Sequence, residues 1–119
     1  MLEKVDYGGN RMKIKEITSE YILFDNGKQI TFENDQNCAY NFADFLALKG
    51  TIGEEFNWYE FKEPLNFEYV ENYGFRFGNG SNMFFVPCYS IQNGWYSDSV
   101  KIFFNGEEVL NYVSGNLII

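Results

Sequence analysis

The chain has 119 residues, a formal net charge of −8 and no histidine. Aromatic residues make up 20% of it, and there are only two prolines and two cysteines. This length predicts a single domain over residues 1–119. The charge argues against a protein that tracks the phosphates of DNA or RNA directly, because such a protein needs a basic stripe.

The acidity has two interpretations. It can confer solubility alone, or it can serve a basic partner by imitating nucleic acid. Cys38 and Cys88 lie far apart and outside any CxxC pair, which is typical of buried apolar thiols, although a disulfide between them stays open. The sequence has no apolar stretch that approaches the roughly 18 residues of a membrane span, and we expect an intracellular protein without membrane contact.

The first half of the chain indicates strands followed by one short helix. Residues 11–17 alternate between apolar and charged residues, as a half-buried strand does. Residues 20–25 and 28–33 flank Asn26-Gly27, the strongest local hairpin signal. Apolar residues at 38, 42, 45 and 46 then predict a short helix over 37–48, capped by Asn37 or Asn41 and stopped at Gly50. An extended conformation of this segment is the alternative.

The second half reads almost entirely as strand. The expected strands cover 56–61, 65–70, 73–77, 83–86, 99–104, 107–113 and the short end 117–119. Pro87 is expected to end its strand or to place it at an edge, and Asn105-Gly106 is expected to make a second hairpin turn. This succession of strands with one short helix predicts a β-rich α+β fold, a twisted antiparallel sheet or a partly closed barrel.

The most informative stretch is Tyr89–Phe104, where an Asn93-Gly94 turn is followed at once by Trp95 and Tyr96. Adjacent residues of a strand point to opposite faces, so both rings cannot enter one core face. One of them is therefore expected at a surface, a groove or a subunit boundary. The alternative is a hairpin corner that is packed by large side chains.

Binding is a better use of these residues than catalysis. The chain lacks the usual general base, its adjacent carboxylate pairs are typical of solvated turns, and it has no EF-hand or phosphate-cradling loop. We therefore predict no enzyme activity, no cofactor and no metal.

The predicted pocket combines cations, aromatic rings and neutral hydrogen-bonding groups. A guanidinium suits a phosphate oxyanion, aromatic rings stack on a purine, and Asn and Ser donate or accept neutral hydrogen bonds. Each cation can instead be a solvated charge on a polar strand face. The predicted ligand-binding residues are Arg76, Phe84, Asn93, Trp95, Tyr96, Ser97 and Lys101.

Two segments carry a resemblance to a known family. Glu33–Phe45 resembles an acidic, Asp-Gln, Cys-containing motif that leads into a short helix, and Asn93–Val100 is similar to a Ser-Asn-Gly-Tyr-Tyr-Ser-x-x-Val motif. Both motifs occur, in this order, in a small phage protein family that includes the Thoeris anti-defence sponge. The chain departs from the family pattern in having a single Cys38 followed by Ala39, and Gln92 before Asn93.

The resemblance implies a non-enzymatic bacteriophage protein of immune evasion. Such a protein captures a nucleotide immune signal, a cyclic ADP-ribose isomer or a cyclic oligonucleotide, in the cytoplasm of the bacterial host. It also implies assembly as a homodimer or a higher homo-oligomer, with Asn93 at the ligand and the neighbouring aromatic rings stacked against it. Arg76 and Lys101 are the candidate phosphate contacts.

Two other functions stay open on the residues alone. The first is an acidic inhibitor, like an anti-CRISPR protein, that docks on a basic nucleic-acid-binding surface of a host defence protein through carboxylates and exposed aromatic rings. The second is a structural or virion-associated β-domain without a soluble ligand.

Overall fold

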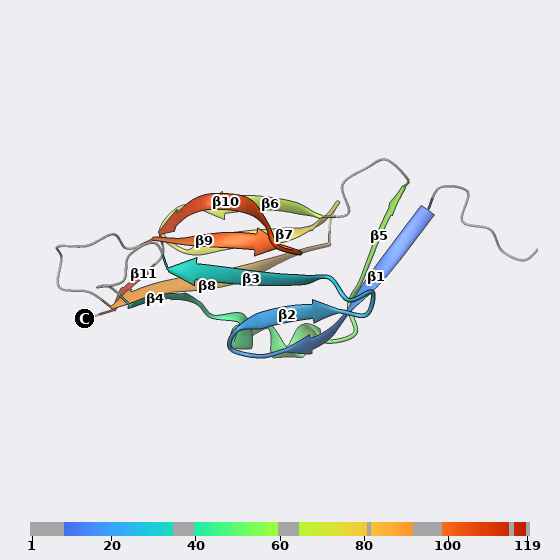
Figure 1. Ribbon diagram of the computed structural model, residues 1–119, viewed down its shortest axis with the longest axis horizontal. Helices are drawn as coiled ribbons and strands as arrows, with labels where there is room; N and C mark the ends of the chain where they lie inside the picture. The colour runs from blue at the N-terminus through green and yellow to red at the C-terminus, as the bar shows by residue number, and fades with distance from the viewer. Residues whose placement is uncertain are drawn as a thin grey trace, which may run out of the picture.

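A computed structural model describes residues 9–34, 40–59, 65–80, 82–91, 99–114 and 116–118 (Figure 1). Within these ranges the chain forms eleven strands and one 3-10 helix. In chain order they are β1 (Gly9–Ile17), β2 (Tyr21–Phe24), β3 (Gln29–Asn34), β4 (Tyr40–Ala43), η1 (Phe45–Thr51), β5 (Glu55–Tyr59), β6 (Asn66–Val70), β7 (Gly74–Asn79), β8 (Asn82–Ile91), β9 (Ser99–Phe104), β10 (Glu107–Ser114) and β11 (Asn116–Ile118).

The strands form two sheets that curl into a half-barrel. One sheet has six strands in the order β10-β9-β3-β2-β1-β5, and the other contains β11, β8, β7 and β6, with β4 also paired to β8. All described pairings are antiparallel except that of β11 with β8. The edge strands β10 and β5 contact β6 and β7 of the second sheet. The predicted fold class, a β-rich fold with a twisted antiparallel sheet or a partly closed barrel and one short helix, is confirmed.

Both predicted hairpins are present. At the first, Asn26 Oδ1 accepts the Lys28 amide at 3.0 Å and joins β2 to β3. At the second, Asn105 and Gly106 have φ angles of 53° and 87°, the two positive values that a type I′ turn requires. This turn twists as its flanking strands do, so β9 and β10 pair directly across it.

The helix predicted over 37–48 is wrong in its position. Tyr40–Ala43 is strand β4, and the helix is a 3-10 helix that starts at Phe45 and runs through Gly50. Asn41 therefore does not cap a helix. The apolar spacing was misleading because Phe42 packs against the Tyr89 ring, with centroids 5.5 Å apart, and Ala43 pairs with Cys88 of β8. Tertiary strand pairing outweighs a helical pattern of this length.

Pro87 does not end its strand, contrary to that part of the prediction. β8 continues to Ile91, and Pro87 is the last residue of β8 that pairs with β7. The next residue, Cys88, pairs with Ala43 of β4, and the Pro87 carbonyl accepts the Asp44 amide at 2.8 Å. Pro87, which has no backbone N–H, thus lies where β8 changes its partner from β7 to β4. Little hydrogen bonding between strands is lost at such a position.

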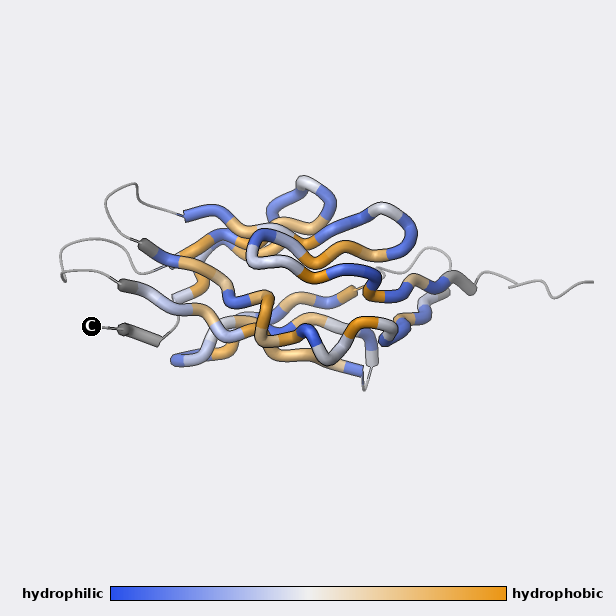
Figure 2. Tube along the Cα trace, turned by 90° about the horizontal axis from the view of Figure 1, so that it is seen from below, coloured by the Kyte–Doolittle hydropathy of each residue, from blue (hydrophilic) through white to orange (hydrophobic). Residues whose placement is uncertain are grey.

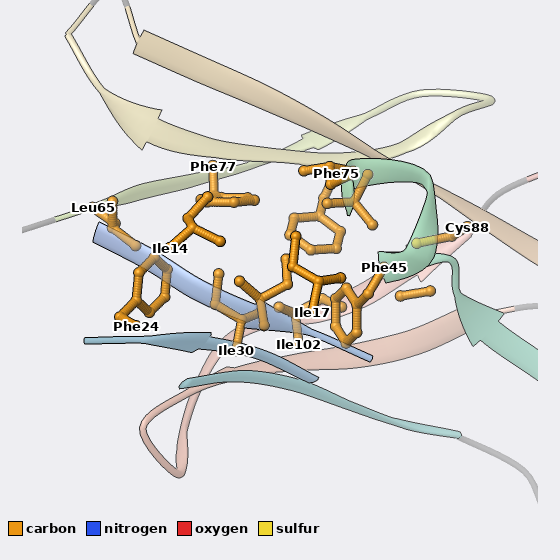
Figure 3. Packing of buried hydrophobic residues seen from close by; sticks show 14 of the residues in the cluster. Ile14, Ile17, Phe24, Ile30, Phe45, Leu65, Phe75, Phe77, Cys88 and Ile102 are labelled. Atoms are coloured by element: carbon orange, nitrogen blue, oxygen red, sulfur yellow. The ribbon is translucent and has the colours of Figure 1, made fainter. Parts of the chain in front are cut away.

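The inner faces of both sheets enclose one core that is rich in phenylalanine (Figure 3). Phe24, Phe56 and Phe77 are fully buried, and their rings meet in edge-to-face or tilted pairs with centroids 5.9–6.1 Å apart. Each such ring stabilises the fold by roughly 1.5–3 kcal/mol through burial. Hydrophobic and hydrophilic stretches follow one another along the trace in Figure 2. In β2 the buried residues alternate with half-buried ones, the two-residue period of a strand with one inner face.

Side-chain hydrogen bonds close the two seams between the sheets. The amides of Asn79 and Asn82 donate to the backbone carbonyls of Asn57 and Glu55 on β5, the second over 2.8 Å. At the other seam the hydroxyl of Tyr69 on β6 lies 2.9 Å from the Ser114 hydroxyl on β10. The two asparagine bonds satisfy carbonyls of the edge strand β5 that would otherwise be open to pairing with another chain.

Candidate ligand-binding site

The candidate site lies at one end of the half-barrel, on the left in Figure 1. Strands β3 and β8 end there, and β4 and β9 begin there. The described parts of the two motif segments, Glu33–Phe45 and Asn93–Val100, therefore meet at this end although they are far apart in the chain.

Asn41 joins the two motif segments directly. Its backbone amide donates to Asn34 Oδ1 at 2.7 Å, which fixes the start of β4 against the end of β3. Its side-chain Nδ2 donates to the Ser99 carbonyl at 3.3 Å, at the start of β9. One buried asparagine thus holds the described ends of both segments together.

The interior of this end is polar but uncharged. Asn41, Ser90 and Ser99 are fully buried, and they are the buried polar residues of the described part of the chain. Ser90 lies opposite Asn41 in the β4–β8 register. Ser90 Oγ has no hydrogen-bond partner among the described residues. Buried hydroxyls are normally paired, so this group needs a physical explanation.

Cys88 lies next to this polar end, on the same face of β8 as Ser90. It is a free thiol that is 1% exposed, and in Figure 3 it lies at the edge of the core near Phe45. Burial first, and the Asp44 carboxylate second, raise the pKa of Cys88 to about 12. Its thiol is therefore protonated at neutral pH, and it serves packing rather than nucleophilic chemistry.

Backbone bonds around Cys88 hold this part of β8 in place. Its amide donates to the Tyr73 carbonyl at 2.9 Å. The Tyr73 ring also meets the exposed Phe85 ring edge to face. Burial is the first cause that raises the pKa of the Tyr73 hydroxyl, followed by nearby Tyr89, so this phenol stays neutral.

Most of the predicted ligand-binding residues belong to the Asn93-Gly94 turn. Asn93, Trp95, Tyr96 and Ser97 lie outside the described residues, as does Cys38. The exposure of one of the two rings at a surface, groove or subunit boundary stays a prediction.

The remaining predicted residues are not brought together. Arg76 lies on the outer face of β7, where its Nε donates to Glu68 Oε1 at 2.6 Å and its guanidinium lies 5.8 Å from the Phe85 ring centroid. Phe84 points to the opposite, inner face and packs on Phe56 and Phe77.

Lys101 lies on the other sheet from Arg76. It stands between the buried Val100 and Ile102 on β9 and faces outward, opposite Glu33 of β3. Arg76 and Lys101 thus face outward from different sheets, whereas Phe84 faces the core. The three side chains cannot contact one small ligand together. Alternation in the sequence predicts which side chains of a strand point inward and which point outward. It does not predict which sheet the strand joins.

Sequence reasoning missed Asn41 and Ser90 as site residues. A usable signal exists for Ser90, because it continues the row Val86, Cys88 on the core-facing side of one strand. A polar residue at a core-facing position is informative, since it needs a partner. Asn41 gave no such signal because its segment was interpreted as a helix.

Comparison with known proteins adds no relative: no family model, no curated protein and no solved structure matches the chain. In the part of the chain that the structure describes, no helix is both long and apolar enough to cross a membrane. Across the same residues, no three His, Cys, Asp or Glu side chains gather as metal ligands.

Proposed function

We propose that the protein is a non-enzymatic phage anti-defence protein that binds and sequesters a nucleotide immune signal, a cyclic ADP-ribose isomer or a cyclic oligonucleotide. The observation that carries this proposal is the meeting of the two motif segments. Asn41 links Asn34 to Ser99, so the residues that flank 35–39 and those that flank 92–98 belong to one end of the barrel. A shared ligand site needs this proximity.

The chemistry of the described wall fits a ligand with many neutral hydrogen-bonding groups. The buried polar residues there are an asparagine and two serines. Such a wall can hold a ligand without reacting with it. This supports capture rather than cleavage.

Isothermal titration with cyclic ADP-ribose isomers and cyclic dinucleotides tests the proposal. We expect one member of this panel to bind at micromolar concentration or tighter. Asn93→Ala and Trp95→Ala should each weaken that binding at least tenfold, since a lost base stack alone costs about 1–3 kcal/mol. Asn111→Ala, an exposed asparagine on β10, is the matched control and should bind as the wild type does.

No heat with any member of the panel would contradict nucleotide capture. A protein partner recovered from host lysate at low salt, and lost steeply as salt rises, would then favour the acidic inhibitor instead.

A further inference from the structure

The Ser90 hydroxyl is the feature of this end that the fold itself does not explain. It is fully buried, yet its Oγ has no hydrogen-bond partner in the described part of the chain. Leaving a buried hydroxyl unpaired costs about 1–3 kcal/mol. An apolar residue would avoid this cost at a core-facing position, so we expect the hydroxyl to have a partner beyond the described residues.

The groups around Ser90 are uncharged. Asn41 lies opposite it across the β4–β8 ladder, and Cys88 precedes it on the same face of β8. The charged group that acts on this part of the strand is the Asp44 carboxylate, which helps to raise the pKa of Cys88. Among the described residues, a buried phosphate would meet this like charge and no cation, an arrangement that is strongly unfavourable.

We propose that the Ser90 hydroxyl binds an uncharged hydrogen-bonding group of the nucleotide, a ribose hydroxyl or an atom of the base edge, while the phosphates lie away from it. This assignment rests on the proposed function. It divides the ligand by chemistry: the neutral moiety enters the buried polar end, and the charged moiety faces the solvent side.

If the Ser90 hydroxyl binds the ligand, its removal lowers the affinity without lowering the melting temperature of the free protein. The loss of a structural serine would instead lower the melting temperature. Ser90→Ala removes an unpaired hydroxyl from the free protein, so its melting temperature should stay the same or rise. The same change should weaken binding of the tightest cyclic ADP-ribose isomer about fivefold, as expected for one neutral hydrogen bond. Isothermal titration and thermal unfolding without ligand measure the two effects.

Cys88→Ala is the matched control because it lies on the same strand and the same inner face. It should lower the melting temperature through a cavity and leave the affinity unchanged. A probe with hypoxanthine in place of adenine changes only the base edge. A loss at Ser90→Ala that persists with this probe assigns a ribose hydroxyl, and one that disappears assigns the base.

Three results would overturn the assignment. Ser90→Ala could bind as the wild type does, or it could lose more than a hundredfold in affinity, which would indicate a phosphate partner. It could also lower the melting temperature as Cys88→Ala does while binding normally, which would make the hydroxyl structural. In each case the wild type still binds, so the proposed function would survive; a wild type that binds no member of the panel would remove both.

Discussion

At the scale of single residues, the chemistry of the interior depends on which buried polar groups have hydrogen-bond partners and which carry a proton. Cys88 was expected to be a buried thiol, and this is confirmed by its 1% exposure. Burial penalises the thiolate, and Asp44 penalises it further. Cys38 was expected to behave in the same way, but it lies outside the described residues.

The raised pKa of Cys88 makes stability fall at high pH. The folded protein keeps the proton up to about pH 12, whereas the unfolded thiol loses it near its ordinary value of 9.0. The folded state therefore binds more protons between these limits, and stability is lost as pH rises through them. We expect the stability difference between wild type and Cys88→Ala to shrink by about 1 kcal/mol from pH 8 to pH 10.

Urea unfolding of both variants at each pH measures this change. The subtraction removes the titration of other groups, which the two variants share. A difference that is independent of pH would show that the thiol titrates normally in the folded protein.

At the scale of elements, pairing between strands fixes the secondary structure of segments whose local sequence pattern is ambiguous. The two hairpins were predicted correctly because Asn26-Gly27 and Asn105-Gly106 need no distant partner to choose their turns. Strand β4 was missed because four residues of it carry too little pattern to compete with a helical spacing. Its conformation is fixed by β8, which lies far along the chain.

The side chains of Asn79 and Asn82 hold the edge strand β5 against the second sheet. Asn82 donates to the Glu55 carbonyl on the outer edge of β5, 27 positions earlier in the chain. We expect Asn82→Ala to lower the free energy of unfolding by about 1 kcal/mol, because this partly buried carbonyl loses its donor. Urea unfolding measures the loss.

Asn66→Ala is the control for this change, since Asn66 is exposed on β6. It should stay within about 0.5 kcal/mol of the wild type, as surface substitutions usually do. Equal losses for the two variants would show that the seam bond does not hold β5.

At the scale of the whole molecule, the fold depends on contacts between distant parts of the chain. Strand β9 lies between β10 and β3 in the six-stranded sheet, and β1 pairs with β5 although β2, β3, β4 and η1 lie between them in the chain. The two motif segments meet for the same reason. The candidate site is therefore a product of topology, and no local segment contains it.

A chain that ends at Ile91 should not fold. It lacks β9 and β10, so β3 loses its neighbour and the core loses the fully buried Ile102 and Val113. We expect no cooperative unfolding transition, measured by circular dichroism in urea. A chain that ends at Ser114 lacks only β11, which pairs with β8 alone, and it should fold with a lower urea midpoint. A cooperative transition in the shorter chain would mean that the N-terminal strands form a unit of their own.

The sequence by itself determined the fold class, both Asn-Gly hairpins and the facing of most strands, because these depend on local alternation and turn chemistry. Only the tertiary structure decided that 40–43 is a strand, that β8 passes through Pro87, and that Arg76 and Lys101 face outward from different sheets while Phe84 faces the core. It also placed Asn41 and Ser90 together in a buried polar end. The physical reason is that alternation gives a strand two faces but not its neighbours, and those neighbours are chosen by burial and hydrogen bonding across the whole chain.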